Sequence, residues 1–214
     1  EYVVVQYELG TVIDRLKDDD DGFADGIHVQ RENHGADLVA LLRNGGTDDG
    51  TAGIAFMLDN LDGDPEWAFS VTEAQATNSW HAFTHEIGHN LGCAHDRVAA
   101  KGPGLFDYSY GHHIDDLEVM TIMSYSKNDE DRVPYFSNPS LNYEGYALGV
   151  SSSSPESADN AKTIEVSSLI VAAYRKSLPT IPEFEEHEAV RYVKPGSKIT
   201  LRSRAVGLPE LSLQ

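Results

Sequence analysis

Three histidines and a glutamate lie within one twelve-residue stretch, residues 85–96. His85 and His89 are four positions apart, and on a helix two side chains with this spacing point into the same space and can share one ion. Gly92 can adopt the positive φ that lets a chain leave a helix sharply, which would bring His95 back as a third ligand. Three neutral imidazoles leave a tetrahedral zinc ion one open position for water or substrate. The spacing therefore predicts a catalytic zinc site.

Glu86 is the residue in this stretch that could move a proton. It follows His85 on the flank of the predicted helix, where its carboxylate could reach a zinc-bound water without binding the metal itself. Zinc lowers the pKa of such a water to about 7, so a carboxylate can accept its proton at neutral pH. Glu86 would then pass the proton to the leaving amine of a peptide. The alternative, surface histidines on an ordinary helix, explains neither the glutamate nor the third histidine.

The rest of the chain must supply elements that hold this stretch. Apolar and β-branched runs between polar turns predict strands at residues 2–7, 37–42, 53–58 and 67–71. Helical spacing predicts helices at residues 23–33, 80–91 and 158–176. Thr77, Asn78 and Ser79 are candidate N-caps of the helix that carries the histidines. Residues 94–149 are rich in Gly, Tyr, Ser and Asp, which favours a loop-dominated region over a second sheet.

Charge and composition exclude several classes of partner. The 214 residues include 16 basic and 35 acidic side chains, for a formal net charge of −19. Nucleic acids and anionic membranes would repel such a chain. The sequence contains no run of about 18 apolar residues, so it predicts no membrane-spanning helix. The single cysteine, Cys93, has no internal disulfide partner. The composition is typical of an acidic exported or salt-adapted protein, and the first residues contain no signal peptide, so we expect a piece of a longer secreted product.

Around the histidines the sequence resembles the metzincin metallopeptidases, specifically the bacterial reprolysin-like group related to the adamalysins. Asp96 follows the third histidine as in adamalysins, and residues 121–125 resemble the family's Met-turn, with Met123 as the apolar floor beneath the histidines. The resemblance covers residues 2–176. It implies an α+β zincin catalytic domain with a twisted mixed sheet over the active-site helix, a loop-rich lower subdomain and a C-terminal helix. The family's first strand and helix have no counterpart, so we expect an N-terminally truncated domain.

The resemblance also implies roles with alternatives that stay open. Tyr125 lies two residues after the Met-turn methionine, where some relatives bind the transition state or a fifth zinc position, but it could equally pack against its neighbours. Gly53, Ile54 and Ala55 would form the sheet's edge strand and pair with an extended substrate, unless they form an ordinary internal strand. The acidic segments 18–21 and 59–64 could bind Ca²⁺, but neither has a specific calcium motif, and solvated loops are the alternative.

These observations lead to one functional prediction and one rival. We expect a metallopeptidase domain at residues 1–178, a linker at residues 179–188 and the start of a truncated immunoglobulin-like β-sandwich at residues 189–214. The predicted activity is that of a secreted, zinc-dependent endopeptidase, a hydrolase whose substrates are extracellular proteins or peptides. The rival is a catalytically impaired zinc-binding or adhesion module. A zinc amidase that acts on non-protein substrates is a more remote alternative.

Overall fold

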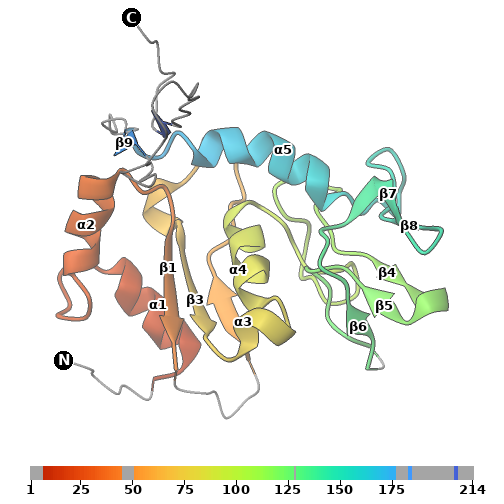
Figure 1. Cartoon of the computed structure of the whole chain (residues 1–214), viewed down its shortest axis with the longest axis horizontal. Helices are drawn as coiled ribbons and strands as arrows, with labels where there is room; N and C mark the ends of the chain where they lie inside the picture. Colours follow the sequence, from red (N-terminus) through yellow and green to blue (C-terminus); the bar gives the residue numbers. More distant parts are fainter. Residues whose placement is uncertain (1–6, 45–50, 128, 177–182, 185–204, 207–214) are drawn as a thin grey trace, which may run out of the picture. The chain divides into compact units, whose positions relative to one another are not determined.

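The computed structural model describes residues 7–44, 51–127, 129–176, 183–184 and 205–206 (Figure 1). The chain divides into two compact units, residues 1–175 and 176–214. In the second unit the described residues form one antiparallel pair, β9 (Glu183–Phe184) with β10 (Ala205–Val206). Most of the strand predicted at residues 2–7, and most of the predicted linker and β-sandwich, lie outside the described residues, so the predicted domain boundaries stay predictions.

A three-stranded mixed sheet forms the centre of the first unit. Its strand order is β1-β3-β2, with the bounds β1 Val39–Arg43, β2 Gly53–Ala55 and β3 Phe69–Glu73. β1 runs parallel to β3, whereas β2 runs antiparallel to it. The three predicted strands are confirmed with shifted ends, and the mixed sheet agrees with the predicted α+β class.

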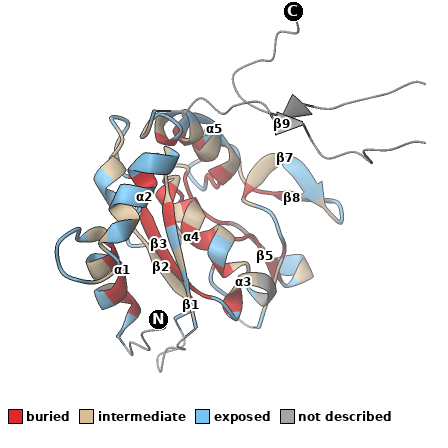
Figure 2. Ribbon diagram, turned by 60° about the vertical axis from the view of Figure 1, so that its left-hand side comes forward, coloured by how far each residue is buried: buried red, intermediate tan, exposed pale blue. Residues whose placement is uncertain are grey.

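The main apolar core lies between this sheet and helix α1 (Leu9–Lys17). The buried face of α1 follows the spacing i, i+3, i+4, i+7 of an amphipathic helix, and consists of Leu9, Val12, Ile13 and Leu16, all 4% exposed or less. Phe69 and Val71 of β3 pack against it because alternate strand residues share a face. Figure 2 shows this buried layer along the facing surfaces of helix and strands. α1 lies outside the helices that were predicted from the sequence.

Four further helices complete the α-helical part of the first unit as described. Their bounds are α2 Gly26–His34, α3 Ala76–Ser79, α4 Ala82–Asn90 and α5 Asn160–Val171. α1 and α2 lie on one side of the sheet and α4 on the other (Figure 1). The prediction of one helix capped within residues 77–79 is wrong, because His81 adopts φ 52° and separates α3 from α4. α5 is capped by Asp159, whose side chain accepts a hydrogen bond from the Lys162 backbone N–H.

Residues 94–149 form the lower region, which has little regular structure. Its first sheet has the order β4-β5-β6, with the two-residue strands β4 His113–Ile114, β5 Val119–Met120 and β6 Asp131–Arg132. A hairpin of β7 (Asn138–Tyr143) and β8 (Tyr146–Leu148) follows. Short 3-10 turns at Pro65–Trp67 and Asp115–Leu117 complete the described elements of this unit. Short strands therefore interrupt the loops that the sequence predicted here.

Candidate metal centre

Helix α4 positions two of the three predicted ligands, and its C-terminal end redirects the chain to the third. His85 and His89 lie one turn apart on α4, and Gly92 adopts φ 81° directly after the helix. The Cys93 N–H donates back to the Gly88 carbonyl at 2.9 Å, which closes the helix end. A Cβ atom at position 92 would lie 2.7 Å from Leu105 Cβ, so space as well as backbone angle requires glycine there.

The three histidine side chains converge on one point. His95 Nε2 lies 3.0 Å from His89 Nε2 and 3.1 Å from His85 Nε2. A tetrahedral zinc ion with zinc–nitrogen distances of 2.0–2.1 Å separates its ligand nitrogens by about 3.3 Å. The three imidazoles are therefore spaced closely enough to hold one such ion, and they form one of the groups of described side chains that could bind a metal.

The hydrogen bonds of these rings determine which nitrogen faces the centre. His85 Nδ1 lies 2.8 Å from the Ile122 carbonyl oxygen, and His89 Nδ1 lies 2.8 Å from the Cys93 carbonyl oxygen. A carbonyl only accepts, so each Nδ1 carries the proton and a neutral ring leaves its lone pair on Nε2.

Burial keeps these rings neutral. Burial, followed by the neighbouring His89, lowers the pKa of His85 well below its ordinary value. Burial and then His95 lower the pKa of His89 to about 4, and burial lowers that of His95 against the opposing effect of Asp96. Three unprotonated lone pairs at about 3 Å repel one another unless a cation lies between them. The donor set therefore fits a divalent metal.

Met123 lies beneath the metal-binding turn of α4. Its side chain is 0% exposed and packs with Cys93 and Ile122 in one small apolar cluster. A Cβ atom on Gly88 would lie 2.5 Å from Met123 Sδ and 2.9 Å from an edge carbon of Phe136. Glycine between the two helix histidines therefore allows the methionine to approach the helix backbone.

The Glu86 side chain lies against β2. The residue is 5% exposed, and a Cβ atom on Gly53 would lie 2.5 Å from Glu86 Oε1. Burial raises the pKa of Glu86 to about 8 in the metal-free chain, with Arg132 acting in the opposite direction. A bound dication would act in the same direction as Arg132 and favour the ionised carboxylate of Glu86.

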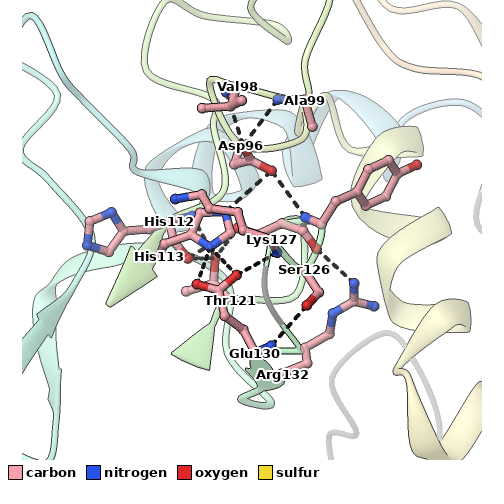
Figure 3. A network of polar contacts seen from close by, with 12 residues as sticks. Asp96, Val98, Ala99, His112, His113, Thr121, Ser126, Lys127, Glu130 and Arg132 are labelled. Carbon is pink, nitrogen blue, oxygen red and sulfur yellow. Dashed lines mark hydrogen bonds and ion pairs between the residues drawn. The ribbon is translucent and has the colours of Figure 1, made fainter. Parts of the chain in front are cut away.

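Asp96 connects the loop of His95 to the Met-turn. Its Oδ1 accepts hydrogen bonds from the Val98 and Ala99 N–H groups, and its Oδ2 accepts one from the Tyr125 N–H at 3.1 Å (Figure 3). Burial acts to raise the pKa of Asp96, but these backbone donors and His113 outweigh it and the pKa is lowered. The side chain after the third histidine thus joins two loops 29 residues apart.

His113 continues this network. Its Nδ1 lies 2.9 Å from a Glu130 carboxylate oxygen, and its Nε2 lies 3.5 Å from Asp96 Oδ2 (Figure 3). Glu130 also accepts from the Lys127 N–H, while the Lys127 ammonium pairs with Asp115. A second group of side chains with a geometry that could bind a metal consists of His113, Asp115 and Glu130. Its two carboxylates are already engaged, that of Glu130 by His113 and the Lys127 N–H, and that of Asp115 by the Lys127 ammonium.

A cleft of about 700 Å³ opens beside the histidines. It is bordered on one side by β2 and on the other by the segment after the Met-turn, and its lining includes His85, Glu86, Gly53, Tyr125 and Arg132. The Tyr125 ring is 51% exposed, with its centroid 4.1 Å from that of His95. The cleft therefore brings one candidate metal ligand, His85, together with a carboxylate and a sheet edge at one accessible surface.

Comparison with known families agrees with this geometry. A family model described as "Metallo-peptidase family M12B Reprolysin-like" matches residues 13–154, which is more than half of the chain. The chain belongs to the reprolysin-like M12B metallopeptidases. The predicted family is therefore confirmed, and membership of this metallopeptidase family implies a metal ion that the three histidines fit.

Curated relatives of this reprolysin-like chain include peptidyl-Asp metalloendopeptidases. The protein of that name from Stenotrophomonas maltophilia is 30% identical over 171 residues, which cover 77% of this chain and 38% of the relative. The corresponding protein from Xanthomonas campestris is 29% identical over 167 residues, with 77% and 37% covered. The chain thus spans less than two fifths of the length of the relatives it matches.

One solved structure resembles the reprolysin-like fold at lower sequence identity. A chain described under "Structure of a chaperone-substrate complex" superposes with a TM-score of 0.59 and 20% identity. The match covers 82% of this chain and 29% of that chain. At this identity the similarity concerns the fold alone.

The structure places the other predicted site residues as follows. Gly53, Ile54 and Ala55 form β2, which lies at one edge of the described sheet. The acidic segments 18–21 and 59–64 contribute to neither metal-type group found among the described residues, so Ca²⁺ has no support. None of the described helices is long and apolar enough to cross a membrane. Sequence reasoning missed Arg132 and His113, because their partners lie far away in the sequence.

Proposed function

We propose that this chain carries the catalytic centre of a zinc-dependent endopeptidase that hydrolyses peptide bonds of extracellular proteins. The observation that carries the proposal is the convergence of three neutral imidazole Nε2 atoms beside a buried carboxylate in an open cleft. His85, His89 and His95 would hold the metal. When bound, zinc supplies a Lewis acid that polarises a carbonyl group and makes water more acidic.

Glu86 would act as general base and then as general acid. It lies next to the first proposed ligand and lines the cleft. In the ionised form it would accept a proton from the attacking water and donate that proton to the leaving amine nitrogen. The close approach of Gly53 supports this role, because a larger residue there would displace the carboxylate.

The β2 edge would hold the substrate backbone. β2 pairs with β3 along one side only among the described residues, so its outer N–H and C=O groups face the cleft side of the sheet. An extended peptide could add to this edge as a further strand. Gly53 lies on the same strand and contacts Glu86, which would bring the bound backbone close to the proposed base.

Tyr125 could stabilise the oxyanion that develops on the scissile carbonyl, and packing against His95 is the alternative role. Its exposure and its position on the cleft wall favour contact with substrate. A phenol oxygen that donates a hydrogen bond to a developing oxyanion lowers the barrier more than it stabilises the ground state.

The names of the curated relatives suggest where the bond is cut. They are called peptidyl-Asp metalloendopeptidases, and we propose that this chain also cleaves beside aspartate. Its net charge of −19 agrees with an acidic exported protein and opposes nucleic-acid partners. The proposed catalytic domain spans residues 1–178, with the linker and the accessory β-domain beyond it.

Hydrolysis of a fluorogenic peptide library by the zinc-loaded chain tests this proposal. We expect cleavage by the wild type and a loss of at least about 100-fold in kcat for Glu86→Gln. Metal content is measured on both samples, because the comparison requires equal zinc. A zinc-loaded wild type that binds peptides without cutting them would contradict the proposal and favour the zinc-binding module instead.

A further inference from the structure

Arg132 is the cation that lines the cleft together with the proposed catalytic groups. It ends β6, the short strand that runs parallel to β5, and it borders the same cavity as His85 and Glu86. Among the described lining residues it carries the only arginine or lysine side chain. Its position after the Met-turn places a positive charge on the cleft wall opposite β2.

Two backbone carbonyls hold the guanidinium in place. Arg132 Nη1 donates to the Trp80 carbonyl at 2.5 Å, and Nη2 donates to the Ser124 carbonyl at 2.7 Å. The first carbonyl precedes α4 and the second belongs to the Met-turn, so the guanidinium is fixed relative to both parts of the candidate metal centre. A side chain held in this way loses little further conformational freedom when it binds a ligand.

The same guanidinium has unused hydrogen-bonding capacity. Arginine carries five N–H donors, and the Nε of Arg132 is buried without a hydrogen-bond partner. Arg15, Arg43 and Arg175 each form an ion pair with a carboxylate of the described residues, whereas Arg31, Arg97 and Arg132 do not. Of these three unpaired arginines, only Arg132 lines the cleft. Burial lowers the pKa of Arg132, and the electrostatic effects of Tyr125 and Glu86 oppose this lowering only in part.

Acidic residues near the cleft do not supply the missing partner. Asp129, Glu130 and Asp131 all line the cavity, yet none of them pairs with Arg132. The Glu130 carboxylate is engaged by His113 and by the Lys127 N–H. Glu86 and Tyr125 interact with Arg132 only through longer-range electrostatics. In a chain with 35 acidic residues, a half-buried arginine without a carboxylate is positioned to receive one from outside.

We propose that Arg132 is the specificity-determining residue that binds the side-chain carboxylate of an aspartate next to the scissile bond. This inference rests on the proposed peptidase function and assigns its substrate preference to one side chain. A carboxylate can accept two parallel N–H bonds from a guanidinium, whereas the neutral amide of asparagine cannot form the same charged pair. The two backbone carbonyls would keep the guanidinium oriented while its remaining N–H groups receive the substrate.

Peptide binding to the zinc-loaded 214-residue chain with Glu86→Gln tests the inference without requiring turnover. Two peptides are used that differ only in one Asp or Asn residue, and their Kd values are measured by calorimetry. We expect the Asp peptide to bind about tenfold or more tightly than the Asn peptide. Adding Arg132→Gln should reduce that ratio to about one, because charge-assisted hydrogen bonds account for the preference.

Arg97→Gln is the matched control. Arg97 also donates to backbone carbonyls, those of Ser157 and Asp107, but it does not line the cleft. It should preserve the preference for the Asp peptide. Equal binding of both peptides before Arg132 is changed, or a preference that survives Arg132→Gln, would overturn the inference.

Two additional readouts separate the inference from its premises. If Arg132→Gln fails to fold by circular dichroism, the Nε–H resonance of Arg132, assigned by its absence in Arg132→Lys, is followed by NMR. That resonance should shift on addition of the Asp peptide and not the Asn peptide, and an unchanged resonance would overturn the inference. Cleavage by the Glu86-intact chain is measured in parallel. A preserved binding preference without cleavage would contradict the proposed peptidase function while supporting the role of Arg132.

Discussion

The sheet region and the lower region meet at the candidate metal centre, yet different forces stabilise them. The sheet region, α1 with β1–β3 and α4, is built around a continuous apolar core that includes Leu16, Phe69 and Val71. The lower region, residues 94–149, has smaller apolar clusters and depends on side chains that bind backbone groups of distant loops. Asp96 and Arg132 are two such side chains.

This difference divides the tasks of the site. Two of the proposed ligands, His85 and His89, come from a helix packed on the sheet, whereas His95 comes from a loop held by the polar contacts of Asp96. We therefore expect core substitutions to act mainly on global stability. Substitutions in the polar network should act more strongly on metal affinity than on the fold.

The largest expected effect lies in the sheet region. Leu16→Ala should lower the free energy of unfolding by about 2–5 kcal/mol, because Leu16 is 2% exposed and its removal leaves a cavity in the core. Leu169→Ala is the matched control, since Leu169 is 76% exposed on α5, and should change stability by less than about 0.5 kcal/mol. Urea unfolding of the zinc-loaded variants measures both. Equal costs would contradict the assignment of the core.

The next effect tests the polar network. Asp96→Asn should lower stability by about 1–3 kcal/mol, because the amide cannot accept the Val98, Ala99 and Tyr125 N–H groups as well as the carboxylate does. Zinc affinity should fall about 10- to 100-fold, since Asp96 positions the loop that carries His95. Competition with a chelator measures the affinity. The control is Asp107→Asn, because Asp107 is an exposed aspartate of the same region, and this substitution should leave the zinc affinity unchanged. If Asp96→Asn also left the zinc affinity unchanged, the distinction between the two regions would be wrong.

A smaller effect should appear in the pH dependence of the metal-free chain. Glu86 has a pKa of about 8 when folded, against about 4.5 for its ordinary value, so the folded state retains a proton that the unfolded state loses. Stability should therefore decrease as pH rises, by about 1–2 kcal/mol between pH 6.5 and 8. The three histidines act in the opposite direction at the lower end of this window, because the unfolded chain still protonates them near pH 6.5 whereas the folded chain does not. The Glu86 contribution is therefore the difference between the wild type and Glu86→Gln.

Thermal unfolding at several pH values measures this decrease. Glu86→Gln should remove it, and so should zinc, because a nearby dication lowers the pKa of the carboxylate. A decrease that persists in Glu86→Gln would show that another group is responsible.

The smallest effect concerns the floor of the metal centre. Met123→Leu conserves volume in a fully buried position and should cost less than about 1.5 kcal/mol, with kcat changed only a few-fold. Gly88→Ala is the contrasting variant, since its Cβ would lie 2.5 Å from Met123 Sδ and force one of the two to move. Peptide hydrolysis and zinc content compare the two. A Met123→Leu chain that loses zinc would show that the sulfur contributes more than packing.

The sequence predicted the sheet region better than the lower region, for physical reasons. Strand and helix periodicity are local signals, and they located β1–β3, α4 and α5. The convergence of His85, His89 and His95 also follows from local geometry, a helical turn and the bend at Gly92. Helix α1 was missed although its apolar spacing was available in the sequence.

The polar network could not be predicted in the same way. Asp96 binds a backbone group 29 residues away, and Arg132 binds the Trp80 carbonyl 52 residues away. Neither contact leaves a pattern in the sequence around it, because the partner is a main-chain group that every residue carries. The cation on the cleft wall therefore became evident only from the folded chain.

The central claim is that three histidines of this chain hold a zinc ion and leave one position open. X-ray absorption at the zinc edge of the fully loaded chain tests it most directly. The account predicts three imidazole nitrogens at about 2.0–2.1 Å and one further light-atom ligand, with a reduced imidazole contribution in His95→Ala. A spectrum with fewer than three imidazoles, or one that His95→Ala leaves unchanged, would contradict the assignment.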